Sequence, residues 1–282
     1  MEMDSERFFA LRIDDVPEYP DLRQVENLAM ALEKNEAKAT LAICSGWLRD
    51  WKVVQPTIKR LYDEGWADIA CHGMYHEDFG GVGMVSQYGP SDHYFRPLTL
   101  PETHDVLQES QSFAKSFFGD TYKVFVTPGA NLTSVFLPKD IATFYEILRI
   151  NGFKAIAHYP GICGVDPLVR VAKRTPHICE IPFTVYVDFY RRGYFKNAFT
   201  PDNYERYVET TKAYIKARFD QGLFAVLMLH MINFHPDPLP EAGYPGGNLG
   251  GRFIGSITGW IREKYPDVKM VGMSDLIPLA VD

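Results

Sequence analysis

Two pairs of side chains in this sequence are of types that bind metal ions. Asp14 and Asp15 are adjacent at the end of an apolar run. His72 and His76 are four residues apart, and on a helical turn this spacing would place both imidazoles on one face, where a cation could bridge them. Two imidazole nitrogens and one carboxylate oxygen suit zinc, and three protein ligands leave a position open for water or substrate. The residue types therefore predict a catalytic metal site that one Asp completes.

The same residues also have common structural uses. An Asp-Asp pair before Pro17 can cap a helix or form a turn. His72 and His76 can be an exposed helical pair without a metal. His230, which ends another apolar run, can be a histidine satisfied within the core. Because these residues occur together in one order along the chain, we favour the metal site over the structural alternatives.

Apolar periodicity predicts strands that alternate with helices along most of the chain. Strand-like runs fall at 7–14, 37–43, 66–71, 122–127, 153–157, 178–189, 223–229 and 268–271. Helical periodicity falls at 21–36, 52–64, 100–118, 138–150, 201–220 and 253–264. Such alternation implies parallel strands, and enough units close into a barrel whose active site gathers at the C-terminal strand ends. Asp14, His72 and His230 all fall at such ends.

Length and composition favour one globular domain over residues 1–282. The net charge of -7 argues against an extended nucleic-acid interface, and a neutral substrate is more natural. No apolar run is long enough to span a bilayer and the first residues lack an export signal, so we expect a cytoplasmic protein without a membrane partner. Reduced thiols are expected for the four cysteines, which lack metal-ligand spacing: Cys44, Cys71, Cys163 and Cys179.

Two long segments, 77–98 and 232–252, each follow a candidate site residue. We expect them to form the walls of a substrate cleft; surface insertions are an equally common use of loops of this length. His93 and His235 lie on these segments and could touch substrate. Some aromatic residues could stack on sugar rings, although packing is the more frequent role of any one of them: Tyr88, Tyr94, Phe95 and Trp260.

Three short blocks carry a family resemblance: Ile13-Asp14-Asp15-Val16-Pro17, His72-Gly73-Met74-Tyr75-His76 and Leu227-Met228-Leu229-His230. In their order and spacing they resemble the polysaccharide deacetylase superfamily, also called the NodB-homology or carbohydrate esterase family four fold. The resemblance implies an α/β fold, a distorted (β/α) barrel of about seven parallel strands. It also implies that Asp15, His72 and His76 hold Zn²⁺ or another divalent metal. Asp14 is then the general base and His230 the general acid.

One block of the family pattern departs in this chain. Phe125-Val126-Thr127-Pro128-Gly129 keeps the proline but has Val126 where the family has an arginine that steadies the base. Arg12 stands two residues before Asp14 and would point to the same side of a strand, so we hypothesise that its cation orients the base instead. The alternative is an arginine that pairs elsewhere in the barrel.

Other positions also differ from the family pattern. Gly73 replaces the usual Ser or Thr, and the aspartate-tryptophan block has no convincing match. Asp166 and Asp188 are candidates to tune the general acid. A backbone N–H near Pro128 and Gly129 could face the oxyanion or the substrate, because a glycine allows close approach. These departures indicate a divergent branch of the superfamily.

The resemblance implies a metal-dependent hydrolase that removes an acetyl group from an N-acetylated or O-acetylated sugar or a related conjugate. Hydrolysis of a non-sugar C–N bond is an alternative within the superfamily. A second alternative is a degenerate member that binds carbohydrate without turnover. The missing arginine at position 126 favours this degenerate member, whereas the presence of Asp14 and His230 opposes it.

Overall fold

The structure of the protein, a computed structural model, describes residues 6–77, 79, 98–128, 138–158, 170–182, 184–187, 189 and 203–281. The chain divides into two compact units. The first comprises Met1–Thr40, Val53–Asp68 and Thr184–Gly272, and the second comprises Leu41–Lys52, Ile69–Phe183 and Met273–Asp282. Strands β2 (Ala39–Ile43) and β3 (Ala67–Cys71) contribute residues to both units. The expectation of one domain over residues 1–282 stays a prediction.

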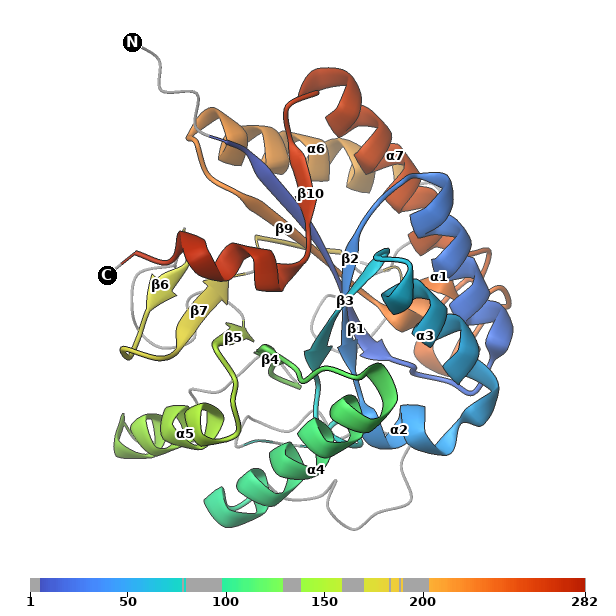
Figure 1. Ribbon diagram of the computed structural model, residues 1–282. Helices are drawn as coiled ribbons and strands as arrows, with labels where there is room; N and C mark the ends of the chain where they lie inside the picture. The colour runs from blue at the N-terminus through green and yellow to red at the C-terminus, as the bar shows by residue number, and fades with distance from the viewer. Residues whose placement is uncertain are drawn as a thin grey trace. The chain divides into compact units, whose positions relative to one another are not determined.

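The first unit is built on parallel strands around β1 (Phe8–Val16). β1 pairs with β9 (Ala225–His230) and with β10 (Lys269–Val271), and β9 pairs with β8 (Val185–Tyr186). The helices of this unit are α1 (Leu22–Lys34), α3 (Gln55–Asp63), α6 (Tyr204–Asp220) and α7 (Leu249–Lys264). Helix α1 packs against α3 and α7, and α6 packs against α7 (Figure 1). Helix α6 also packs against β8 and β9.

The sequence of β1 explains why it lies inside this unit. Phe9, Leu11 and Ile13 are buried, and so is every residue between them. Burial on both faces is typical of a parallel strand that is covered on both sides. Removing an apolar side chain of this size from water stabilises the fold by about 1.5–3 kcal/mol. The buried strand therefore fixes the position of the two carboxylates near its C-terminal end.

The second unit also contains parallel strands. β3 pairs with β4 (Val124–Val126), β4 with β5 (Ala155–His158) and β5 with β7 (Cys179–Pro182), whereas β6 (Ala172–Lys173) is antiparallel to β7. Its helices are α2 (Ser45–Asp50), α4 (Leu100–Phe118) and α5 (Pro138–Ile150), and α4 packs against both α2 and α5 (Figure 1). Short 3-10 helices in the described residues are η1 (Lys52–Val54), η4 (Met231–Phe234), η5 (Pro240–Ala242) and η6 (Met273–Leu279).

Helix α4 shows how local sequence sets the bounds of an element. The Thr99 hydroxyl accepts a hydrogen bond from the backbone N–H of Glu102, and the Glu102 carboxylate accepts one from the Thr99 N–H at 2.8 Å. This reciprocal arrangement satisfies two backbone donors that the first turn leaves without partners. Gly119 ends the helix with φ at 83°, a conformation that glycine adopts without steric cost. The helix predicted at 100–118 is thereby confirmed.

The predicted alternation of strands and helices and the parallel pairing are confirmed, with differences in detail. The described residues contain ten strands where eight strand-like runs were predicted, because the run at 178–189 divides into β7 and β8, and because β6 was not predicted. Helix α2 was also not predicted, since six residues are too few to show a helical period. Segment 232–252 contains most of η4, all of η5 and the start of α7. No helix in the described part of the chain is both long and apolar enough to cross a membrane.

Candidate active site

The C-terminal half of β1 carries a buried ion pair. Arg12 and Asp14 are two residues apart, so their side chains leave the strand on the same side. Arg12 Nε donates to Asp14 Oδ1 at 2.6 Å, and Arg12 Nη2 donates to Asp14 Oδ2 at 2.5 Å. Each residue is only 2% exposed. A planar guanidinium that binds both oxygens of a carboxylate fixes the plane and the direction of that carboxylate.

His230 lies beside these carboxylates at the end of β9. Asp14 and His230 are partners in the parallel register of β1 and β9. Asp15 has φ at 62°, in the left-handed region that a non-glycine residue seldom adopts, and this backbone turn redirects its side chain. Asp15 Oδ2 lies 3.9 Å from His230 Nε2. The first unit therefore brings Asp14, Asp15 and His230 to adjoining strand ends.

The fully buried amide of Asn233, which was not predicted from the sequence, holds the backbone of His230. Asn233 Nδ2 donates to the carbonyl oxygen of His230 at 3.0 Å, and Asn233 Oδ1 accepts from the N–H of Phe189 at 2.9 Å. The hydroxyl of Tyr244 donates to the carbonyl of Asn233 at 2.8 Å. The ring of Tyr186, on β8, meets the His230 imidazole edge-on with centroids 5.7 Å apart. Segments far apart in sequence thus fix His230 from two sides.

In the second unit, His72 and His76 lie on a turn after β3 rather than on a helix, which corrects the expectation of a helical i, i+4 pair. Gly73 and His76 have φ at 82° and 64°, and two left-handed residues within five are incompatible with an α-helix. The turn nevertheless brings the imidazoles together, with ring centroids 5.0 Å apart. The four-residue spacing therefore correctly predicted that the two imidazoles lie close together, although the predicted helical conformation was wrong.

The orientation of His72 is set by a backbone carbonyl. His72 Nδ1 lies 2.9 Å from the carbonyl oxygen of Val126, and both groups are buried. A carbonyl oxygen only accepts, so Nδ1 carries the hydrogen and the lone pair is on Nε2. Histidines that bind metals commonly donate their second N–H in this way. Position 126, where the family pattern has an arginine, thus contributes its backbone to the site.

Glu77 closes the turn that carries the two histidines. Its carboxylate accepts hydrogen bonds from the backbone N–H groups of Met74 at 2.9 Å and Tyr75 at 3.0 Å. Burial raises the pKa of Glu77. A Cβ at Gly73 would overlap Glu77 Oε2, so a side chain at residue 73 would displace the carboxylate that accepts these hydrogen bonds. This contact, together with the positive φ, explains why glycine stands where the family pattern has Ser or Thr.

The remaining predicted residues fall in three groups. His235 is buried, and its Nε2 lies 3.4 Å from Asp21 Oδ2 within the first unit. Trp260 packs edge-on against Tyr265, and Pro128 is buried just after β4. Several predicted residues lie outside the described residues: Tyr88, His93, Tyr94, Phe95, Gly129, Cys163, Asp166 and Asp188.

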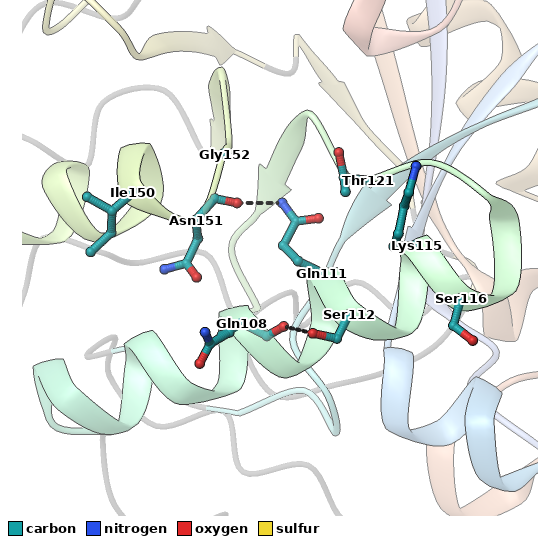
Figure 2. A pocket seen from close by; sticks show the side chains of 9 residues that line it. All are labelled: Gln108, Gln111, Ser112, Lys115, Ser116, Thr121, Ile150, Asn151 and Gly152. Atoms are coloured by element: carbon teal, nitrogen blue, oxygen red, sulfur yellow. Dashed lines mark hydrogen bonds between the residues drawn. The ribbon is translucent and has the colours of Figure 1, made fainter.

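A surface hollow of the second unit is lined by none of the predicted site residues. Figure 2 shows that α4 and the chain after α5 form it. Gln111 Nε2 donates to the carbonyl of Asn151 at 3.0 Å, and Ser112 Oγ donates to the carbonyl of Gln108 at 2.9 Å, so these polar groups are already paired (Figure 2). Its lining contains amides, hydroxyls, Ile150 and Lys115. We assign no role to this hollow.

The family model described as polysaccharide deacetylase matches residues 2–148, which is just over half of the chain. The chain therefore belongs to the polysaccharide deacetylase family, a class of hydrolytic deacetylases, and the resemblance seen in the sequence is confirmed. No curated protein matches the chain at a significant level.

Solved structures agree on the fold. A Mycobacterium smegmatis protein, named a candidate polysaccharide deacetylase, is 16% identical with a TM-score of 0.65, over 99% of this chain and 92% of that one. A CE4 family pseudoenzyme from Bacillus anthracis is 12% identical with a TM-score of 0.54, over 98% and 67% of the chains. A peptidoglycan N-acetylglucosamine deacetylase is 14% identical with a TM-score of 0.51, over 96% and 89%. The protein thus has a mixed α/β fold of parallel strands and helices, similar to the (β/α) barrels of CE4 deacetylases.

Proposed function

We propose that this protein is a metal-dependent hydrolase that removes an acetyl group from an N-acetylated or O-acetylated sugar, in a polymer or a related conjugate. Membership in the polysaccharide deacetylase family supports the reaction class. The observation that carries the proposal is the register of β1 and β9, which places the carboxylate of Asp14 and the imidazole of His230 at adjoining strand ends. A carboxylate and an imidazole side by side are what the paired proton transfers of amide hydrolysis require.

We propose that Asp15, His72 and His76 hold one divalent ion, with Zn²⁺ favoured by the donor types. The fit rests on the turn that brings the two imidazoles together and on the Nε2 lone pair of His72. These are ligands that suit zinc and leave a position open. When bound, such an ion polarises the scissile carbonyl and makes water a better nucleophile near neutral pH.

The chain's own residues then divide the proton transfers. Asp14 accepts a proton from the attacking water, and His230 donates a proton to the leaving nitrogen or oxygen. Arg12 holds both oxygens of Asp14 and takes the place of the arginine that position 126 lacks. We also keep the proposal that a backbone N–H near Pro128 and Gly129 faces the oxyanion or the substrate.

Two other functions remain open to the same test. Some members of the superfamily act on non-sugar C–N bonds, and the proposed residues are equally suited to that amide chemistry. A degenerate carbohydrate-binding member has a structural parallel in the pseudoenzyme from Bacillus anthracis. The paired Asp14 and the adjoining His230 argue against degeneracy, because a binding protein has no need of a general base and a general acid.

Acetate release separates these possibilities. Purified protein, freed of metal and reloaded with Zn²⁺, is incubated with N-acetylglucosamine oligomers, O-acetylated xylan and a panel of small amides. We expect acetate from an acetylated sugar, loss of activity after metal removal, and at least a hundredfold lower kcat in Asp14→Asn. His177→Ala, which changes an exposed histidine, is the control. Release of only a non-acetyl product would favour the C–N alternative, and sugar binding without any product would favour the degenerate one.

A further inference from the structure

A buried indole lies against one of the proposed metal ligands. Trp47, on α2, is 4% exposed, and its ring is nearly parallel to the imidazole of His76, with an interplanar angle of 4° and centroids 6.3 Å apart. Trp51 stacks on Trp47 in turn, at 5.7 Å and 9°. The second unit therefore contains an aromatic stack of three rings that ends on His76.

Backbone hydrogen bonds fix α2 to the turn that carries His76. The N–H of Ser45 donates to the carbonyl of Gly73 at 2.9 Å, and the N–H of Gly46 donates to the carbonyl of Met74 at 2.7 Å. These donors belong to the first turn of α2, where no carbonyl of the helix itself can accept. The turn supplies the acceptors, so Trp47 and His76 are held in one geometry by main chain as well as by ring contact.

The ring faces, rather than a polar contact, account for the position of Trp47. Its Nε1–H is buried and has no hydrogen-bond acceptor among the described residues. Indole has the strongest attraction for positive charge of the aromatic side chains. An imidazole that binds a divalent ion carries part of the positive charge of that ion, whereas a free neutral imidazole carries none. The stack is therefore expected to favour the metal-bound state of His76 over the free state.

We propose that Trp47 is a positioning residue for the metal site: its indole holds the plane of the His76 imidazole and stabilises the histidine when it binds a divalent cation. This inference rests on the proposed metal site and adds a residue from α2 to it. Trp51 stacks on Trp47 and is one ring further from His76. Neither tryptophan takes part in proton transfer.

The test measures metal binding rather than turnover. The dissociation constant for Zn²⁺ is obtained by competition with a chromophoric chelator for wild type, Trp47→Leu, Trp47→Phe and Trp51→Leu. We expect Trp47→Leu to bind Zn²⁺ about 10- to 100-fold more weakly, as for loss of other groups that orient metal ligands. Trp47→Phe, which keeps a flat ring, should recover most of the affinity. Trp51→Leu, which loses an equal ring one place further from His76, should stay close to wild type.

Two further readouts keep a folding defect apart from a positioning role. The melting temperature of each metal-free variant shows whether Trp47→Leu folds. The visible spectrum of the Co²⁺-loaded protein reports the geometry of the metal ligands. Trp47→Leu should change this spectrum, and Trp51→Leu should not. Co²⁺ should also quench the fluorescence of wild type more than that of Trp47→Phe. Equal affinities and spectra in wild type and Trp47→Leu, or no difference in quenching, would overturn the inference. Absence of metal binding in wild type would instead overturn the proposed function.

Discussion

Arg12 and Asp14 form a two-point ion pair on one buried strand of the first unit, and each residue is 2% exposed. Two charges removed from water are costly unless each satisfies the other, and the geometry here is close to ideal. Apolar residues of similar size at positions 12 and 14 would therefore give the fold about the same stability as this ion pair. Its presence indicates a role for the carboxylate beyond packing.

A double-mutant cycle measures that relationship. Arg12→Met leaves Asp14 buried without its partner, so we expect the free energy of unfolding to fall by about 3–5 kcal/mol. The Arg12→Met/Asp14→Leu variant removes both charges and should regain most of that loss, while hydrolysis stays abolished. Urea unfolding of the two single variants and the double variant gives the coupling energy. Additive losses would mean that the pair is not coupled and that Arg12 does not orient Asp14.

Gly46 is predicted to admit no side chain. A Cβ there would lie 2.5 Å from Tyr75 Cζ and 2.8 Å from the carbonyl oxygen of Met74. Gly46→Ala should therefore push the turn away from α2, cost about 1–3 kcal/mol of stability and weaken metal binding. Calorimetry and a Zn²⁺ competition assay check both effects. Gly259→Ala is the matched control, because its Cβ would meet nothing within 4 Å and the change in a helix interior should stabilise by up to about 1 kcal/mol. A Gly46→Ala variant that behaved like Gly259→Ala would contradict the packing argument.

Tyr244 predicts a pH dependence of stability. Burial raises its pKa to about 12, above the usual value of 10.0. Since the folded state binds the phenolic proton more tightly than the unfolded state, this contribution is complete below pH 10 and is lost as the pH rises through 12. Tyr244→Phe should be less stable than wild type by about 1–2 kcal/mol at pH 8, because the hydrogen bond to Asn233 is lost. The gap should narrow by about 1 kcal/mol at pH 11. Urea unfolding measures the free energies. A difference between wild type and Tyr244→Phe that stays constant from pH 8 to pH 11 would show that the pKa of Tyr244 is not raised in the folded protein.

Much of the fold could be predicted because its signals are local. The apolar run of β1, the capping box of α4 and the glycine at residue 119 are each formed by residues within the element that they define or next to it. The bounds of α4 were predicted residue for residue for this reason. Helix α2 has six residues and is held by acceptors from the turn at Gly73 and Met74, so its signal lies in another part of the chain.

In the candidate site, too, local sequence signals were predicted and long-range contacts were not. Asp14, Asp15, His72, His76 and His230 are of distinctive types in a distinctive order, and the sequence pointed to them directly. Their supporting contacts join residues that are distant in sequence and ordinary in type. An asparagine among many, such as Asn233, or a backbone carbonyl, such as that of Val126, leaves no trace in one sequence. Trp47 had a faint signal, since it follows a strand end and is a large aromatic residue beside glycine.

The most direct test of the central claim is the metal content of the purified protein. Wild type, Asp15→Asn and His72→Ala/His76→Ala are dialysed against Zn²⁺ and then against metal-free buffer, and bound zinc is measured by mass spectrometry. His104→Ala/His177→Ala is the control for the loss of two histidines. The account predicts one zinc ion per chain in wild type and in the control, and little or none in the variants of the proposed ligands. Equal zinc content in wild type and in the His72→Ala/His76→Ala variant, or none in wild type, would contradict it.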